Sequence, residues 1–320
     1  MRRISLFALS ITPLLACVSD GGDRQLTGDT ADAATTLATA SDTLSSDSTT
    51  DDTSTADAST DDDTGESGGL KLDTLPAETA DDGPDPEDCI EDVDIVFVMD
   101  VSTTMGPFFD KLESDILAVH DALAAFDLPN PPHYGLAVFV DDFTLVNAGA
   151  PYTDINALKA DFEYWNNFTS SNQQTGGGSF NSTWTENSLD ALFAASGGFQ
   201  WRPVSSTLRM IIHTTDDTFW NGPTVANGVN ILHDYPETVS SLQQREIRMF
   251  TFADHLGGQS GTDDVSEGFF TDYAGQAPIP AQTGGAAYEI GQVLAGVISL
   301  SDAIVGAVEE SYCEEYPPIG

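Results

Sequence analysis

Apolar residues are distributed very unevenly along this chain. From Asp20 to about Glu91 large apolar side chains are almost absent, and the residues are mainly Ser, Thr, Asp and Ala. Such a segment cannot offset the entropy of ordering by burial, so we predict a disordered acidic linker over residues 17–88. Residues 89–320 alternate short apolar runs with amphipathic stretches and are predicted to form one folded domain.

The periodicity of the folded part predicts alternating strands and helices. Residues 94–100 contain an unbroken apolar run, 95–99, that is too short for a helix, as is typical of a strand buried on both faces. Phe109, Leu112 and Ile116 then recur at helical spacing. The same alternation predicts strands at 134–140, 143–147, 208–213, 247–253 and 286–289, and helices at 107–126, 154–165, 186–195, 236–244, 263–274 and 291–310. This order favours an α/β fold, a doubly wound and mostly parallel sheet with helices on both faces.

The charge balance restricts the classes of partner. The chain has 52 acidic and 10 basic residues, a net charge of −42, which disfavours contact with nucleic-acid phosphates. A divalent cation or a basic protein surface fits this sign better. Solubility alone is the simpler explanation of the charge.

The first residues have the pattern of an export signal over residues 1–16. Arg2 and Arg3 precede an apolar stretch, residues 4–15, that is shorter than the ~20 residues a membrane-spanning helix needs. Its end, Leu-Leu-Ala-Cys17, resembles the lipobox of bacterial lipoproteins. The resemblance implies cleavage before Cys17, acylation of its thiol, and anchoring to the cell envelope; Val18 then favours the outer membrane or cell surface. The alternative is an ordinary cleaved signal with a coincidental cysteine.

The other two cysteines flank the predicted domain. Cys89 precedes its first strand and Cys313 follows its last helix. In an exported protein a disulfide between them is chemically plausible and would join the two ends of the domain. Two unpaired thiols are the alternative.

Oxygen-bearing side chains follow directly after the first strand. Asp100, Ser102 and Thr104 stand two residues apart. In open α/β sheets ligands bind at the carboxyl ends of the strands, and such oxygen donors suit a hard cation. Catalysis has little support: the segment around Ser260 lacks the spacing of a nucleophile elbow, and the five histidines show no zinc spacing. We therefore predict a binding protein and no enzyme.

The Asp100-x-Ser102-x-Thr104 pattern resembles the metal-ion-dependent adhesion site of von Willebrand factor type A domains. Residues 185–195, 201–202, 208–217 and 234–236 resemble the A-type domain of integrin β subunits, so the likeness extends over about 94–312. It implies that Glu186 and Asp216 complete the metal site. It also implies Mg²⁺, with Mn²⁺ or Ca²⁺ as alternatives, and a protein ligand whose carboxylate completes the coordination of the ion.

The sequence departs from the integrin pattern at the two neighbouring ion sites. No carboxylate follows the first motif until Asp110, and Thr183 stands where an aspartate is expected, although Asn181 fits. Neither additional ion is therefore predicted. The alternative function is a metal-independent scaffold subunit of an envelope complex.

Five aromatic residues occur in the loops around the proposed metal site. They either form a recognition rim or fold over the site and are buried. These residues are Phe168, Phe180, Trp184, Phe219 and Trp220.

Overall fold

The computed structural model describes residues 89, 92–126, 128–178, 180–255 and 264–318. The predicted signal, Cys17, the linker and the segment around Ser260 lie outside the described residues. No helix in the described part of the chain combines the length and the apolar character needed to cross a bilayer.

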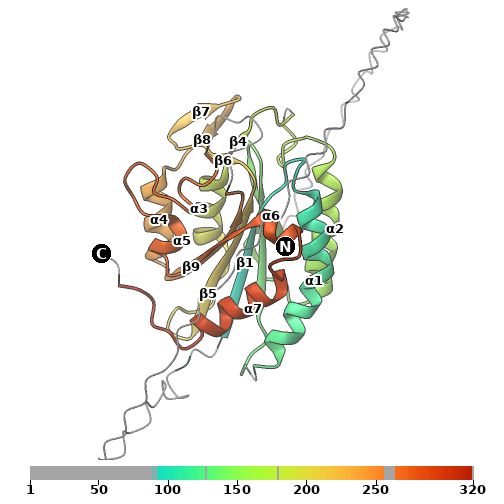
Figure 1. Cartoon of the computed structure of the whole chain (residues 1–320), viewed down its shortest axis with the longest axis vertical. Helices are drawn as coiled ribbons and strands as arrows, with labels where there is room; N and C mark the ends of the chain where they lie inside the picture. The colour runs from blue at the N-terminus through green and yellow to red at the C-terminus, as the bar shows by residue number, and fades with distance from the viewer. Residues whose placement is uncertain (1–88, 90–91, 127, 179, 256–263, 319–320) are drawn as a thin grey trace, which may run out of the picture. The chain divides into compact units, whose positions relative to one another are not determined.

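A six-stranded sheet runs through the centre of the domain (Figure 1). Its strand order is β10-β9-β5-β1-β2-β3, and all neighbours pair in parallel except β2 and β3, which are antiparallel. Every residue of β1 is buried, as the unbroken apolar run predicts. The strands are β1 (Asp92–Asp100), β2 (His133–Phe139), β3 (Phe143–Leu145), β5 (Thr207–Thr215), β9 (Ile247–Ala253) and β10 (Ala287–Glu289).

Helices cover both faces of this sheet, which confirms the predicted fold class (Figure 1). Alternate residues of β1 point to opposite faces, so Phe97 joins one apolar core and Val96 the other. The core containing Phe97 is covered by α1 (Gly106–Ala124), α2 (Ile155–Thr169), α6 (Ile290–Leu294) and α7 (Leu300–Ser311). The core containing Val96 is covered by α3 (Ser188–Gly198), α4 (Tyr235–Gln243) and α5 (Ile279–Gln282).

Two small sheets lie outside the central one, and neither was predicted. β4 (Thr185–Glu186) pairs in parallel with β6 (Thr218–Phe219), while β7 (Thr224–Ala226) and β8 (Val229–Ile231) form an antiparallel hairpin. These strands have two or three residues each, too few for an alternating pattern to stand out in the sequence.

Two of the predicted helices were wrong. Residues 264–274 form turns instead of a helix, because Gly268 and Ala274 have φ angles of 82° and 50°, outside the right-handed helical region. The predicted helix over 291–310 is divided into α6 and α7, and Gly296, with φ of 72°, lies between them. In both segments buried apolar residues imitate helical spacing although the backbone turns.

Element ends also differ from the prediction at two positions. Strand β3 ends at Leu145 because Asn147 and Ala148 have positive φ, and a short 3₁₀ segment, η2 (Val146–Gly149), follows. Glu186, predicted to start a helix, lies in β4, and α3 begins at Ser188.

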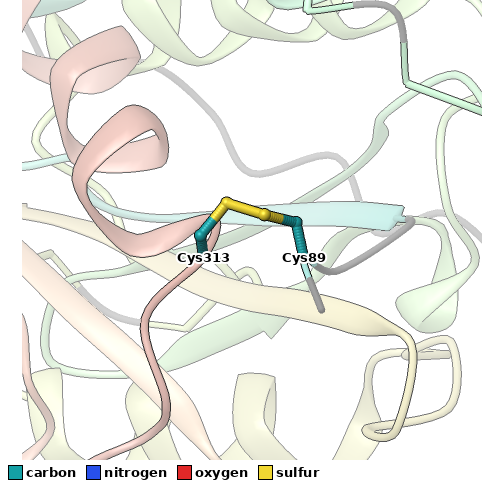
Figure 2. Close-up of a disulfide and its surroundings, with 2 residues drawn as sticks. All are labelled: Cys89 and Cys313. Carbon is teal, nitrogen blue, oxygen red and sulfur yellow. A yellow bond between two sulfur atoms is a disulfide. The ribbon is translucent and has the colours of Figure 1, made fainter. Parts of the chain in front are cut away.

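The predicted disulfide between Cys89 and Cys313 is present, with a Cα–Cα distance of 4.5 Å (Figure 2). It joins the residues just before β1 to those just after α7. Arg248 holds the following segment by donating hydrogen bonds to the carbonyl oxygens of Glu314 (2.9 Å) and Glu315 (2.8 Å). The C-terminal segment is therefore attached to the amino-terminal end of β9 as well as to Cys89.

We expect removal of the disulfide to destabilise the domain. The bond closes a loop with a sequence separation of 224 residues, and a loop of this size restricts the unfolded chain by about 5 kcal/mol in the chain-entropy treatment, with typical measured effects of about 2–4 kcal/mol. The double variant Cys89→Ser/Cys313→Ser should lower the free energy of unfolding in urea by a few kcal/mol. When reductant is added to the parent, its free energy of unfolding should fall toward that of the variant. Equal free energies of unfolding for the oxidised parent, the reduced parent and the variant would contradict this prediction.

Candidate metal site at the carboxyl edge of the sheet

Asp100 is the last residue of β1, and its carboxylate is completely buried. The backbone N–H of Ser102 donates to one carboxylate oxygen at 2.7 Å, and the Thr215 hydroxyl donates to the other at 2.8 Å. Thr215 ends β5, the parallel neighbour of β1. The side chain of Asp100 is thus held between the ends of two adjacent strands.

Ser102, Thr104 and Asp216 form a short chain of hydrogen bonds at the same edge. The Thr104 hydroxyl donates to the Asp216 carboxylate at 3.0 Å and lies 3.2 Å from the Ser102 hydroxyl. Asp216 directly follows β5, so the pairing of β1 with β5 brings Asp216 and Thr104 together across a separation of 112 positions. Four of the five predicted metal ligands therefore lie in one cluster.

Glu186, the fifth predicted ligand, reaches the site from β4. It is completely buried, and its Oε1 accepts a hydrogen bond from the Asn181 amide at 3.0 Å. Its Oε2 has no hydrogen-bond partner among the described residues. A buried carboxylate oxygen without a partner is costly, and its presence indicates a position for an additional ligand.

A pocket of about 240 Å³ opens beside these groups. Ser102, Thr104 and Glu186 contribute to its wall. The other lining residues are Thr103, Asn172, Asn181, Ser182, Thr183, Trp184 and Asp217. Nearly every lining side chain carries an oxygen, the donor that hard divalent cations prefer.

Asp217 belongs to this cluster, although the sequence predicted this role for Asp216 alone. One carboxylate oxygen from each of Asp100, Asp216 and Asp217 lies within 4.8 Å of the others. The consecutive Asp-Asp pair at the end of a strand was the available signal. That both carboxylates reach the cluster depends on the backbone after β5, and this is visible only in the structure.

Burial and mutual repulsion perturb the carboxyl groups. Loss of water, followed by the nearby charge of Asp216, raises the pKa of Asp100 to about 7 despite the hydrogen bonds it accepts. Burial and the charge of Asp100 raise the pKa of Glu186 well above its usual value. Burial also raises the pKa of Asp216. The site thus holds more negative charge than its protein surroundings neutralise.

The donor set fits a divalent cation. No Lys, Arg or His in the described part of the chain forms an ion pair with Asp100, Asp216 or Glu186. These three carboxylates, one of which has the unpartnered oxygen Oε2 of Glu186, and the hydroxyls of Ser102 and Thr104 are the hard oxygen ligands that Mg²⁺, Mn²⁺ or Ca²⁺ bind.

The positions considered for neighbouring ions are occupied differently. Asp110 is exposed on α1 and accepts a hydrogen bond from the Asn166 amide. Thr183 donates a hydrogen bond to the buried Asp141, which also accepts from Gln174 at 3.2 Å. Neutral donors therefore surround Asp141, which the sequence did not single out as part of the site.

His213 is a core residue and not a ligand. It is completely buried, bonded to the hydroxyls of Ser188 and Thr251 at 2.8 Å each, and stacked on Phe139. Burial lowers its pKa to about 3, so the imidazole is neutral.

The five loop aromatics divide between the two arrangements considered from the sequence. Phe168 and Phe219 pack against the two apolar cores, and Trp220 is half-buried. Phe180 and Trp184 are exposed by 64% and 49%, and Trp184 lines the pocket. Of the five, these last two are the ones exposed enough to form part of a recognition rim.

Comparisons with known proteins give distant structural similarities only. No protein-family model and no curated protein matches the chain. An aerotolerance-related membrane protein from Bacteroides fragilis, solved with multiple mutations to serines, is 14% identical over 69% of this chain and 98% of its own, with a TM-score of 0.39. BatB from Bacteroides thetaiotaomicron is 16% identical over 68% and 98%, with a TM-score of 0.41. Proximal thread matrix protein 1 from the mussel byssus is 13% identical over 72% and 48%, with a TM-score of 0.38.

The raised pKa of Asp100 predicts a pH-dependent stability of the metal-free protein. The folded form binds the proton of the Asp100 carboxyl group more tightly than the unfolded chain does. The contribution of this proton to the free energy of unfolding is therefore complete below about pH 4 and is lost as the pH rises to about 7. In chelator, Asp100→Asn should therefore gain stability relative to the parent between pH 4 and pH 7, measured by urea unfolding. Parallel pH profiles of the two proteins would contradict the assignment.

Proposed function

We propose that this chain is an exported bacterial lipoprotein whose domain binds a divalent cation and, through it, a carboxylate of a partner protein. The proposed ligands are Asp100, Ser102, Thr104, Glu186 and Asp216, and the ion is Mg²⁺, with Mn²⁺ or Ca²⁺ as alternatives. The observation that carries this proposal is the buried Glu186 Oε2, which has no partner among the described residues, in a side chain that lines the pocket. The resemblance to von Willebrand factor type A domains supports it independently.

The ligands divide into two groups by their position. Ser102 and Thr104 line the pocket, and we assign their hydroxyls a direct contact with the ion. Asp100 and Asp216 are not among the lining residues, and we assign them a contribution partly through water, which Mg²⁺ retains readily. The ion supplies the positive charge that this cluster lacks and an open position for an external carboxylate.

We further propose that the domain binds its partner without catalysis. No histidine is among the described residues that line the pocket, so the Ser102 and Thr104 hydroxyls have no imidazole there to remove a proton. The bound carboxylate would bridge two proteins through the ion. Such a contact breaks when the metal is removed, unlike the contacts of a metal-independent scaffold.

The lipid anchor and the linker complete the proposal. Acylation at Cys17 would attach the chain to the cell envelope, and two or more acyl chains give the stable anchoring that one does not. The acidic segment 18–88 would then separate the folded domain from the membrane, at the outer membrane or cell surface.

Magnesium titration tests the proposed ligands. By isothermal calorimetry, the purified protein should bind Mg²⁺ and Mn²⁺ saturably, and Asp100→Ala and Asp216→Ala should lower the affinity at least about ten-fold, the loss expected when a charge-assisted contact worth about 1.4 kcal/mol or more is removed. Asp121→Ala, which removes an exposed carboxylate on α1, is the matched control and should bind like the parent. Circular dichroism checks that each variant is folded.

Absence of metal binding in the folded parent would reject the adhesion mechanism. In that case the metal-independent scaffold function would remain. Equal affinities of the parent and both site variants would instead show that the ion binds elsewhere, for example to the acidic linker.

The anchoring proposal predicts incorporation of labelled palmitate into the expressed protein. Cys17→Ser should abolish both the label and co-sedimentation with membranes, because the acylated thiol is removed. Cys89→Ser, which alters another cysteine, should keep the label. Retention of the label in Cys17→Ser would exclude this residue as the acylation site.

A further inference from the structure

The segments beside the pocket are free of charged residues in a chain that is otherwise strongly acidic. No Asp, Glu, Lys or Arg occurs between Glu163 and Glu186 or between Asp217 and Asp234, although the chain carries 52 acidic residues. Within these two stretches, we call residues 180–185 and 218–231 the collar. An uncharged collar in such a chain is a departure from its overall composition.

The collar also exposes large apolar side chains. Phe180 is 64%, Trp184 49% and Val225 67% exposed. Trp184 lines the pocket directly. Exposed aromatic side chains at the edge of a polar pocket are typical of protein-recognition surfaces.

Hydrogen bonds join the two parts of the collar into one surface. β4 pairs with β6, and the Thr218 hydroxyl donates to that of Thr185 at 3.1 Å. In the hairpin, the Asn227 amide donates to Asp141 at 2.5 Å and to the Ser182 hydroxyl at 3.2 Å. The hairpin is therefore fixed against the segment that carries Phe180 and Trp184.

Asp141 is the common attachment point of this surface. It is 1% exposed and accepts hydrogen bonds from Gln174 and Thr183, in one segment beside the pocket, and from Asn227 in the hairpin. A single buried carboxylate bound by neutral donors orders these segments without adding charge to the exposed face. The collar thus has a defined shape beside the metal site.

We propose that the collar is the specificity surface of the metal site, and that it takes a protein segment in which one Asp or Glu is the only charged residue and is flanked by large apolar side chains. The carboxylate would reach the ion, and a neighbouring apolar side chain would pack on Phe180 and Trp184. This inference rests on the proposed metal-dependent function and adds the chemistry of the ligand.

Charge complementarity argues for this occupant. A carboxylate that approaches an acidic domain is repelled, and an uncharged collar adds no further like charge at the rim of the pocket. Additional acidic residues in the ligand would face the remaining negative charge of the domain. Basic flanking residues would find no exposed carboxylate on the collar, because the collar contains none.

The inference can be tested by peptide selection on the purified full-length chain. The probe is a displayed library of heptapeptides with a central Asp and random flanks, selected in Mg²⁺ and in chelator; a library with a central Asn is the control. We expect magnesium-dependent enrichment from the Asp library only, with aromatic or aliphatic residues beside the Asp and with Asp and Glu depleted from the flanks.

Variants then locate the contact with one enriched synthetic peptide. Phe180→Ala and Trp184→Ala should each weaken peptide binding at least about ten-fold, as expected for aromatic contacts at the centre of an interface. Phe180→Ala, whose side chain does not line the pocket, should leave the calorimetric affinity for Mg²⁺ unchanged. Tyr164→Ala, at an exposed aromatic outside the collar, should have no effect. Val225→Glu should weaken binding, and its matched control, Val204→Glu at another exposed valine, should not.

The outcomes separate this inference from the function on which it rests. If the folded parent does not bind Mg²⁺, the proposed function itself is rejected. With Mg²⁺ binding intact, charged flanks in the enriched peptides, no enrichment, or insensitivity to Phe180→Ala and Trp184→Ala would overturn the collar as the specificity surface.

Discussion

The exclusion of water from several carboxylates at one edge of the sheet is the constraint on which the site depends. Asp100, Glu186 and Asp216 are placed so that burial raises the pKa of each, and repulsion between carboxylates adds to the effect. The hydrogen bonds that offset part of this cost come from Ser102, Thr104, Thr215 and Asn181. An arrangement of this kind, with no basic partner among the described residues, has the electrostatic character of a cation site.

The fold separates this site from the disulfide that joins the ends of the domain. β1 runs through the centre of the sheet, with Asp100 at its carboxyl end and Cys89 before its amino end. Nine residues of strand span about 30 Å. The bond from Cys89 to Cys313 is therefore far from the carboxylate cluster, and the chain enters the domain at the end of β1 opposite the proposed binding edge.

The distribution of charge around the site complements its chemistry. The chain is acidic overall, yet the segments that form the collar contain no Asp, Glu, Lys or Arg. Negative charge at the site is therefore concentrated in buried groups, where it attracts a cation, and is absent from the exposed collar, where it would repel an acidic ligand. Asp141 orders the collar through neutral hydrogen-bond donors, so the shape of the collar does not depend on exposed ion pairs.

The sequence by itself determined the fold class and the central strand ending at Asp100, because burial on both faces and helical periodicity are local signals. It made a disulfide between Cys89 and Cys313 plausible, since three cysteines leave few pairings, but only the structure decided it against two free thiols. It misjudged residues 264–274 and the break at Gly296, where positive φ angles override an apolar spacing that imitates a helix. Only the tertiary structure decided that Asp217 joins the cluster, that Glu186 Oε2 lacks a partner among the described residues and that Asp141 orders the collar. These features depend on contacts between segments distant in sequence, and such contacts leave no periodic pattern in the chain.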